Sequence, residues 1–167
     1  MSVTANQIAS LTITRGLPAS GKTTWAEQQV ANDHGNTVRV SRDDLREKVF
    51  GGAPNGILDP RGEKQVTLLQ AQMVSSLLMV GGYHVIIDDT NLKPEAVKQW
   101  HGLARSHGAD FHIKDFHTSP EECLKRNKAR GDSGGRMVQE FVFQMMVDNY
   151  FIDGALPPLP EGVTVDN

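Results

Sequence analysis

The chain has 167 residues and a net charge of −3 at pH 7, with 38% hydrophobic and 22% charged residues. This length predicts one domain with a core of its own, and the composition excludes disordered and fibrous classes. The single cysteine, Cys123, excludes an internal disulfide framework and suits a reducing, cytoplasmic compartment. No apolar run reaches membrane-spanning length, and residues 1–10 show no secretory signal. The net negative charge argues against non-specific binding along duplex nucleic acid, but it does not exclude an enzyme that contacts only the end of a strand.

Short β-branched runs alternate with longer helical patterns, which predicts an α/β fold with a mainly parallel sheet of about four to five strands flanked by helices. The expected strands are residues 11–14, 37–41, 85–87 and 110–116. The expected helices are residues 22–31, 42–50, 62–80, 94–107, a helix starting at Pro120, and 136–150. Residues 51–60 are expected to form a loop and 131–135 a flexible break. A proline-rich tail, residues 156–167, is expected to follow a domain of residues 1–155.

Residues 16–23 match the G-x-x-x-x-G-K-[ST] pattern of a phosphate-binding loop (P-loop), with an apolar strand before it and a helical pattern after it. In such a loop the backbone N–H groups surround the phosphates, and the helix adds the positive end of its dipole. Lys22 is expected to reach the β- and γ-phosphates, and the Thr23 hydroxyl is expected to bind Mg²⁺. The predicted nucleotide-binding residues are Gly16, Leu17, Pro18, Ala19, Ser20, Gly21, Lys22, Thr23 and Thr24. The sequence therefore predicts binding of ATP or GTP.

Two aspartates, Asp43 and Asp44, follow the second expected strand. A carboxylate at the carboxyl end of a parallel strand lies where ligands bind in open α/β sheets, and it can accept the proton of an attacking hydroxyl. Arg46 shares a helix face with Asp43 and could hold an anionic acceptor beside it. Both aspartates could instead cap the helix, and spacing does not decide which of them faces a site.

Asp88 and Asp89 end the third expected strand, where P-loop proteins commonly place a carboxylate that orders Mg²⁺. A polar turn is the alternative reading. Residues 125–130 hold four cations and no acid, and glycines follow at positions 131, 134 and 135. These features fit a helical lid whose arginine stabilises a transferring phosphoryl group, although basic residues also simply favour a helix C-terminus.

In this order, the motifs resemble the 5′-kinase domain of bacteriophage polynucleotide kinase, over residues 11–131. The matching pieces are residues 11–13, 21–26, 42–44, 89–92 with Pro94, 125–127 and 130–131. The resemblance implies that Asp43 is the general base on the 5′-hydroxyl and that Arg46 contacts the acceptor phosphate. It also implies that Asp89 supports the site and its metal, with Thr90 and Asn91 on the substrate side. Arg126 and Arg130 of the lid would bind the donor phosphates, with Arg130 and Lys22 catalytic.

There are three departures from the family pattern. Thr23 stands where the family has serine, Asp88 replaces a neutral residue, and no D-x-D-G-T phosphatase signature occurs. The resemblance implies a kinase dependent on ATP and Mg²⁺ that acts on 5′-OH ends of DNA or RNA in nucleic acid repair, without a phosphatase activity. It would work in the cytoplasm, of the host if a phage encodes it, as a monomer or a dimer.

Two other functions stay open at this point. One is a kinase of a small metabolite or nucleoside on the same scaffold, because a fold does not determine the acceptor. The other is a non-catalytic nucleotide-binding module, which would bind ATP without consuming it.

Overall fold

The structure is a computed structural model that describes residues 8–33, 35–53 and 56–167. Its strands are β1 (Ser10–Arg15), β2 (Thr37–Val40), β3 (His84–Ile87) and β4 (Asp110–Asp115). Its helices are α1 (Lys22–Asn32), α2 (Arg42–Phe50), α3 (Pro60–Val80), α4 (Pro94–Ser106), α5 (Pro120–Asp132) and α6 (Glu140–Tyr150). In the described part of the chain, none of the helices is both long enough and apolar enough to cross a membrane.

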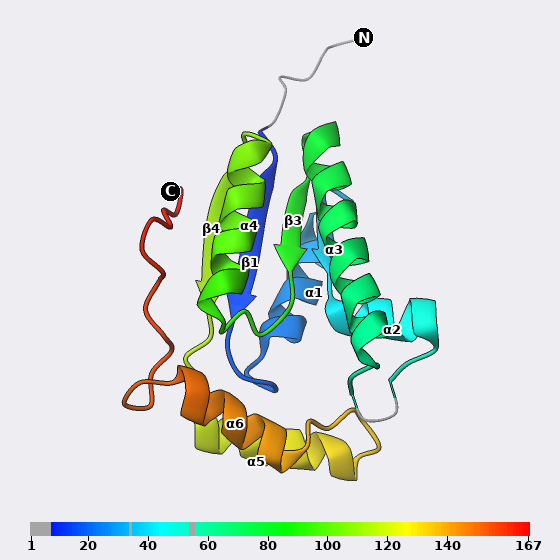
Figure 1. The fold of residues 1–167 in the computed structure, drawn as a ribbon, viewed down its shortest axis with the longest axis vertical. Helices are drawn as coiled ribbons and strands as arrows, with labels where there is room; N and C mark the ends of the chain where they lie inside the picture. The colour runs from blue at the N-terminus through cyan, green and yellow to red at the C-terminus, as the bar shows by residue number, and fades with distance from the viewer. Residues whose placement is uncertain (1–7, 34, 54–55) are drawn as a thin grey trace.

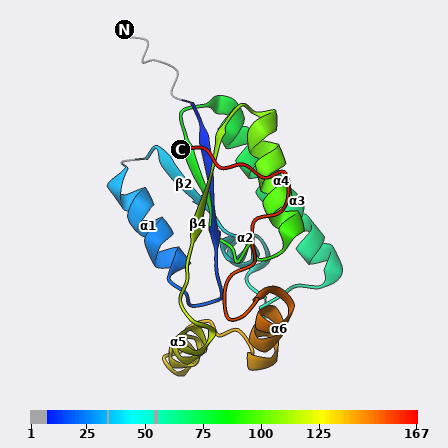
Figure 2. The ribbon, with the colours of Figure 1, turned by 90° about the vertical axis from the view of Figure 1, so that its left-hand side faces the viewer.

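The four strands form one parallel sheet in the order β2-β3-β1-β4. Helices α3 and α4 cover one face of the sheet and α1 covers the other, while α5 and α6 lie across the end toward which the strands point (Figures 1 and 2). The predicted α/β fold with a parallel sheet is therefore confirmed, with four strands. Because all four strands run in the same direction, all of their carboxyl ends point toward α5 and α6.

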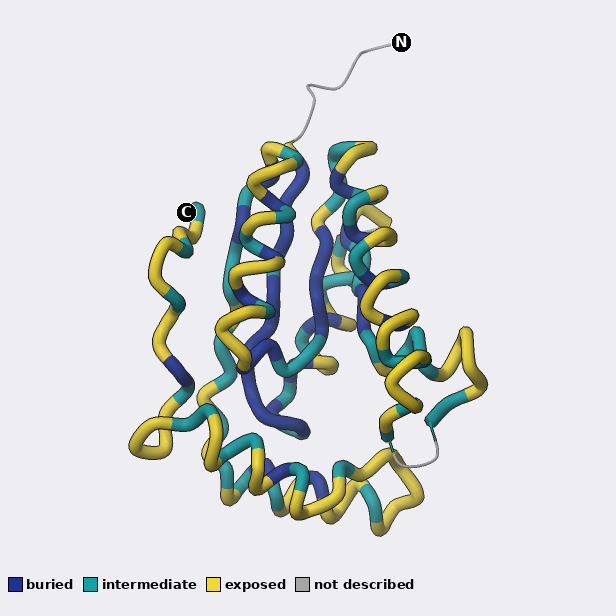
Figure 3. Tube along the Cα trace, in the orientation of Figure 1, coloured by how far each residue is buried: buried dark blue, intermediate teal, exposed yellow. Residues whose placement is uncertain are grey.

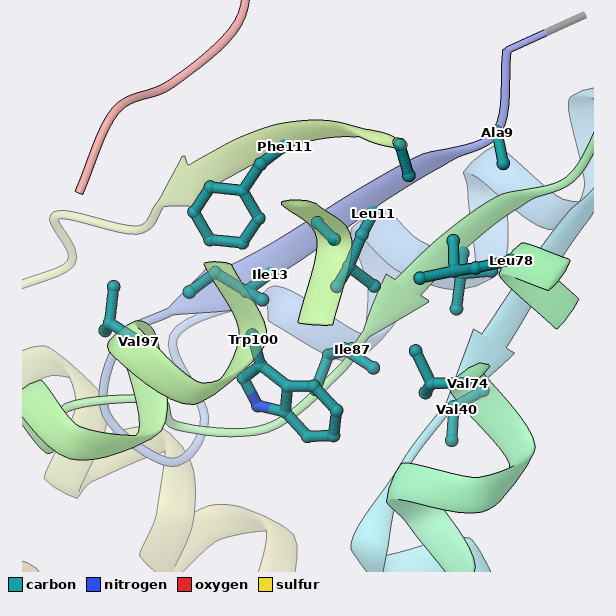
Figure 4. Close-up of a cluster of buried hydrophobic side chains, with 13 residues drawn as sticks. Ala9, Leu11, Ile13, Val40, Val74, Leu78, Ile87, Val97, Trp100 and Phe111 are labelled. Atoms are coloured by element: carbon teal, nitrogen blue, oxygen red, sulfur yellow. The ribbon is translucent and has the colours of Figure 1, made fainter. Parts of the chain in front are cut away.

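The main hydrophobic core lies between the sheet and the helices α3 and α4. Figure 4 shows Leu11 and Ile13 of β1, Trp100 of α4 and Val74 of α3 in one cluster, and all four are almost completely buried. The central strands β1 and β3 are mostly dark blue in Figure 3, as expected for parallel strands covered on both faces. A rigid sheet of this kind fixes the loops at its carboxyl end.

A second hydrophobic cluster joins the helices α5 and α6 to the rest of the molecule. Its fully buried members are Leu17 of the P-loop, Leu92, Cys123 of α5 and Phe143 of α6. The lid predicted from the sequence is thus a two-helix unit that packs directly on the P-loop.

Two predicted boundaries in this lid are wrong. Helix α5 continues through Gly131 to Asp132, and α6 begins at Glu140 instead of residue 136. The backbone of Val138 explains the late start, because its N–H donates to Asn127 Oδ1 at 3.0 Å and its carbonyl accepts from Asn127 Nδ2 at 2.7 Å. Residues 136–139 are therefore held as an extended segment against α5. The predicted loop at 51–60 includes residues 54–55, which lie outside the described residues.

The segment after α6 packs along β4 and contributes to both hydrophobic clusters. Leu156 joins the lid cluster, and Val163 packs against the main core. Arg15 of β1 donates to Pro157 O at 3.0 Å, and the Asp166 backbone N–H donates to Phe111 O at 2.9 Å. Residues 156–167 contain no helix or strand, and these contacts hold them against the sheet. Residues 1–7 of the predicted domain lie outside the described residues.

A buried ion pair connects the two strands at one side of the sheet. Asp88, directly after β3, accepts from Arg39 Nε of β2 at 2.7 Å, and its side chain is 2% exposed. Asp44 of α2 contacts the same guanidinium at 2.7 Å but is 40% exposed. The acid that departs from the family pattern at position 88 is therefore the partner of Arg39.

We predict that Asp88→Ala lowers the free energy of unfolding by about 3 kcal/mol, because it leaves a largely buried guanidinium without its enclosed partner. Asp44→Ala is the matched control, since it removes an exposed partner of the same arginine and costs about 1 kcal/mol or less. Urea unfolding of the two variants measures the difference. Equal losses would show that Asp88 has no special structural role.

Candidate active site

The P-loop connects β1 to α1 in the conformation that its glycines require. Gly21 has φ +102, and a Cβ at Gly16 would lie 2.8 Å from Ser20 Oγ and 3.1 Å from Phe116 Cβ. Gly21 is also the N-cap of α1, and no side chain bonds to the first backbone N–H groups of that helix. These N–H groups carry the positive end of the helix dipole and can bind an anion. Thr23 and Thr24 follow in the first turn, and both are exposed.

Lys22 lies folded over the P-loop. Its ammonium group donates to Leu17 O at 2.5 Å and to Ser20 Oγ at 3.3 Å. Burial lowers the pKa of Lys22 to about 8, and the nearby carboxylates of Asp88 and Asp89 oppose that shift. The lysine is therefore a buried cation bonded to the loop itself, ready to exchange these partners for phosphate oxygens.

The loop after β3 lies against the P-loop. Thr14 Oγ1 donates to the carbonyls of Ile87 and Asp89, and Asn91 Nδ2 donates to Thr14 O at 2.8 Å. The Gly16 N–H donates to Thr90 O at 3.1 Å. Asn91 is buried and has a positive φ of 44, so its amide group is used inside the protein to join the two loops.

Asp89 connects this junction to the helices α2 and α3. Its carboxylate accepts from the Arg42 backbone N–H at 3.1 Å and from Gln70 Nε2 at 2.5 Å. Burial raises the pKa of Asp89 to about 7, and both hydrogen bonds oppose that shift. Asp89 therefore fixes the start of α2 beside the P-loop, and each oxygen keeps a lone pair for a further donor.

The two aspartates of α2 have different surroundings. Ser41 is the N-cap, since its Oγ accepts from the Asp43 backbone N–H at 3.2 Å, so neither aspartate caps the helix. Asp44 contacts Arg39, whereas Asp43 lines a cavity together with Arg46. The structure therefore places Asp43, and not Asp44, at the candidate site.

Arg46 is fixed from behind by Glu63 of α3. Its Nε and one terminal nitrogen each donate to a different Glu63 oxygen at 2.8 Å, and its other terminal nitrogen donates to Asp43 Oδ1 at 2.7 Å. The hydrogen bonds from Arg46 lower the pKa of Glu63 to about 2 and raise that of Arg46. Arg46 is only 12% exposed and is therefore held in one orientation toward Asp43.

The cavity beside Asp43 has a volume of about 380 Å³. One wall comes from α2 and the residues after it, and the other comes from the extended segment between α5 and α6. Arg136 of that segment pairs with Asp43 Oδ1 and donates to Gly56 O at 3.2 Å. Two guanidinium groups from opposite walls thus meet at one carboxylate oxygen.

The predicted lid arginines lie on α5. Arg130 donates to Asn127 Oδ1 at 3.2 Å, and its pKa is lowered by partial burial and by the nearby Arg136. Arg126 is half exposed and bonded to Glu122 of its own helix at 2.8 Å. Arg130 therefore lies toward the cavity side of the lid, whereas Arg126 forms an ordinary surface ion pair.

Two residues of the site were not found from the sequence. Glu63 looks like a favourable acid in the first turn of a helix, and Arg136 was assigned to a helix start. Glu63 contacts Arg46, 17 positions away, and Arg136 contacts Asp43, 93 positions away. No local sequence pattern indicates contacts between residues so far apart.

The residues present fit a metal that is held mainly by phosphate oxygens. The described residues contain no group of three or more histidines, cysteines or acids that could enclose an ion. The exposed Thr23 hydroxyl at the start of α1 can supply a ligand, and Asp89 can orient a water molecule. The arrangement can thus bind a nucleoside triphosphate at the P-loop, and a carboxylate and two arginines line the cavity beside α2.

Known proteins resemble this chain in sequence and in fold. A protein of Autographa californica nuclear polyhedrosis virus, named for polynucleotide kinase and RNA ligase activities, is 28% identical over 127 residues, covering 70% of this chain and 17% of the viral protein. A structure of the Pnkp1/Rnl/Hen1 RNA repair complex matches with a TM-score of 0.72 and 26% identity, over 97% of this chain and 51% of that one. This chain therefore spans only part of both relatives.

The fold is also shared with kinases of small molecules. The APS kinase CysC of Mycobacterium tuberculosis, in complex with AMPPNP and APS, matches with a TM-score of 0.56 and 15% identity over 77% of this chain and 76% of that one. The family model described as an AAA domain matches residues 11–151. With its P-loop and four-stranded parallel sheet, the chain belongs to this AAA domain family and has the fold of P-loop kinases.

Proposed function

We propose that this chain is an ATP- and Mg²⁺-dependent kinase that phosphorylates the 5′-hydroxyl ends of DNA or RNA. The observation that carries the proposal is the cavity beside α2, where Asp43 and the fixed Arg46 face the same space. The resemblance to polynucleotide kinases and the similarity to RNA repair proteins support this acceptor over a small metabolite.

Each side chain would have a distinct task. Asp43 would accept the proton of the 5′-hydroxyl as the oxygen of that group forms its bond to the γ-phosphorus and the bond to the leaving ADP breaks. Arg46 would hold the phosphate next to the hydroxyl, and Asp89 would keep α2 in place beside the P-loop. Lys22 and Arg130 would offset the charge of the transferring group, and Thr23 would hold the metal, which supplies further positive charge on the phosphates.

The direct test is transfer of label from γ-labelled ATP. Matched DNA and RNA oligonucleotides with 5′-OH or 5′-phosphate ends are compared with nucleosides and common metabolites. Label on the 5′-OH strands alone supports an end kinase. Label on a small molecule would contradict the proposed acceptor, and ATP binding without transfer to any acceptor would favour a nucleotide-binding module.

Asp43→Ala is predicted to lower kcat by about 10²- to 10⁴-fold, the usual contribution of a general base, while ATP affinity stays within about twofold. Asp44→Ala is the matched control, because its carboxylate contacts Arg39 outside the cavity. Single-turnover transfer and equilibrium ATP binding measure the two effects separately. Near-normal turnover in Asp43→Ala would contradict its assignment as the base.

ATP affinity is predicted to fall as the pH rises above 8. The pKa of Lys22 is about 8 in the free protein. The charged form that binds phosphate therefore predominates below that pH, and its population falls as the pH rises above it. Bound phosphates favour the ammonium form, and binding near pH 8.5 should therefore take up protons. Calorimetry between pH 7 and 9.5, in two buffers of different ionisation enthalpy, measures both quantities. Constant affinity across this range would contradict the prediction.

A further inference from the structure

Arg136 occupies an unusual position for a residue outside the recognised motifs. It lies in the extended segment before α6 and is 42% exposed, yet its guanidinium reaches across the cavity to Asp43 on α2. A second hydrogen bond, to Gly56 O at 3.2 Å, anchors it to the residues that follow α2. Arg136 thereby closes the cavity over the carboxylate that the proposed reaction uses.

The segment that carries Arg136 is hydrogen-bonded to α5. Asn127 of α5 is 1% exposed and bonds both the N–H and the carbonyl of Val138, two residues beyond Arg136. The Gly135 N–H donates to Arg130 O at 2.9 Å. The same hydrogen-bonded unit thus carries both Arg130 and Arg136.

The cavity presents two arginines and two acids to an entering ligand. Arg46 and Arg136 approach from opposite walls, both contact Asp43, and Glu47 lines the α2 side. Glu63 already binds Arg46 from behind, whereas Arg136 has no such second acid among its described partners. A phosphate entering between the two arginines would give Arg136 a stronger bidentate partner than a half-exposed aspartate.

We propose that Arg136 switches partner during the reaction: it pairs with Asp43 in the free protein and with the phosphate adjacent to the reacting hydroxyl when a polynucleotide end is bound. The proposal rests on the polynucleotide kinase function proposed above and adds a second arginine to the acceptor site. The switch releases Asp43 for proton transfer only when a phosphate occupies the cavity. Arg136 is thus a specificity residue for acceptors that carry this phosphate.

The test uses two 5′-OH oligonucleotides that are identical except at the first internucleotide linkage. One carries the normal phosphodiester and the other an uncharged methylphosphonate. Transfer is measured with wild type, Arg136→Ala, Arg136→Gln and the control Lys128→Ala. Lys128 pairs with Glu140 at 3.1 Å, so the control removes another cation of the lid without touching Asp43.

With the phosphodiester, Arg136→Ala and Arg136→Gln are expected to lower kcat/KM by about tenfold or more, mainly through the acceptor KM, since one charge-assisted hydrogen-bonding partner is lost. With the methylphosphonate they should leave kcat/KM unchanged or raise it, because Asp43 loses a competing partner. The KM for ATP should stay within about twofold, and Lys128→Ala should behave as wild type. The slope of log KM against log salt should fall by about 0.7 in both Arg136 variants.

An equal loss on both oligonucleotides would overturn the partner switch, because Arg136 would then only hold the lid. Wild-type transfer to the phosphodiester strand reports separately on the proposed function. If wild type transfers to that strand and the losses are equal, only the role of Arg136 fails. If wild type transfers to neither strand, the proposed function fails and the role of Arg136 fails with it. Circular dichroism of each variant checks that it is folded.

Discussion

The junction between the carboxyl ends of β1 and β3 determines where every group of the candidate site lies. Thr14 and Asn91 form it with three short hydrogen bonds across more than 70 positions of sequence. The P-loop leaves β1 on one side of this junction, and Asp89 leaves β3 on the other. Through its bond to the Arg42 backbone N–H, Asp89 then sets the start of α2. Asp43 is therefore positioned relative to Lys22 by the sheet itself.

A second layer of positioning comes from charge. Glu63 binds Arg46 through two parallel hydrogen bonds and contacts Arg42 at 2.7 Å, which keeps the Glu63 carboxylate ionised over the whole physiological range. Such a bidentate pair restricts the guanidinium to one plane. The acceptor side of the site thus has one arginine held rigidly by the body of the protein and one carried by the lid. Arg46 is preorganised by its ion pair with Glu63, whereas Arg136 would adjust its position when an acceptor phosphate binds. The two arginines would thus neutralise the same phosphate in different ways.

Much of the fold and part of the site could be predicted from the sequence. The P-loop, its flanking strand and helix, and the parallel sheet follow from local patterns, because glycine spacing and apolar periodicity act over a few residues. The predicted start of α6 was wrong because the side-chain amide of Asn127 in α5 holds residues 136–139 in an extended conformation. The pairs Arg39–Asp88 and Arg136–Asp43 join residues 49 and 93 positions apart. Only the folded chain brings such partners together. Spacing alone left the choice between Asp43 and Asp44 open, and it was the family resemblance that favoured Asp43.

The double engagement of Asp43 has a consequence for water. The Asp43 oxygen that accepts from both guanidinium groups has both of its lone pairs engaged. Water that enters the free site beside bound ATP would therefore find this oxygen already occupied. For the proposed kinase, the contact between Arg136 and Asp43 would suppress wasteful hydrolysis of ATP while no strand end is present. The same ion pair that closes the empty cavity would thus protect the nucleotide until its acceptor arrives.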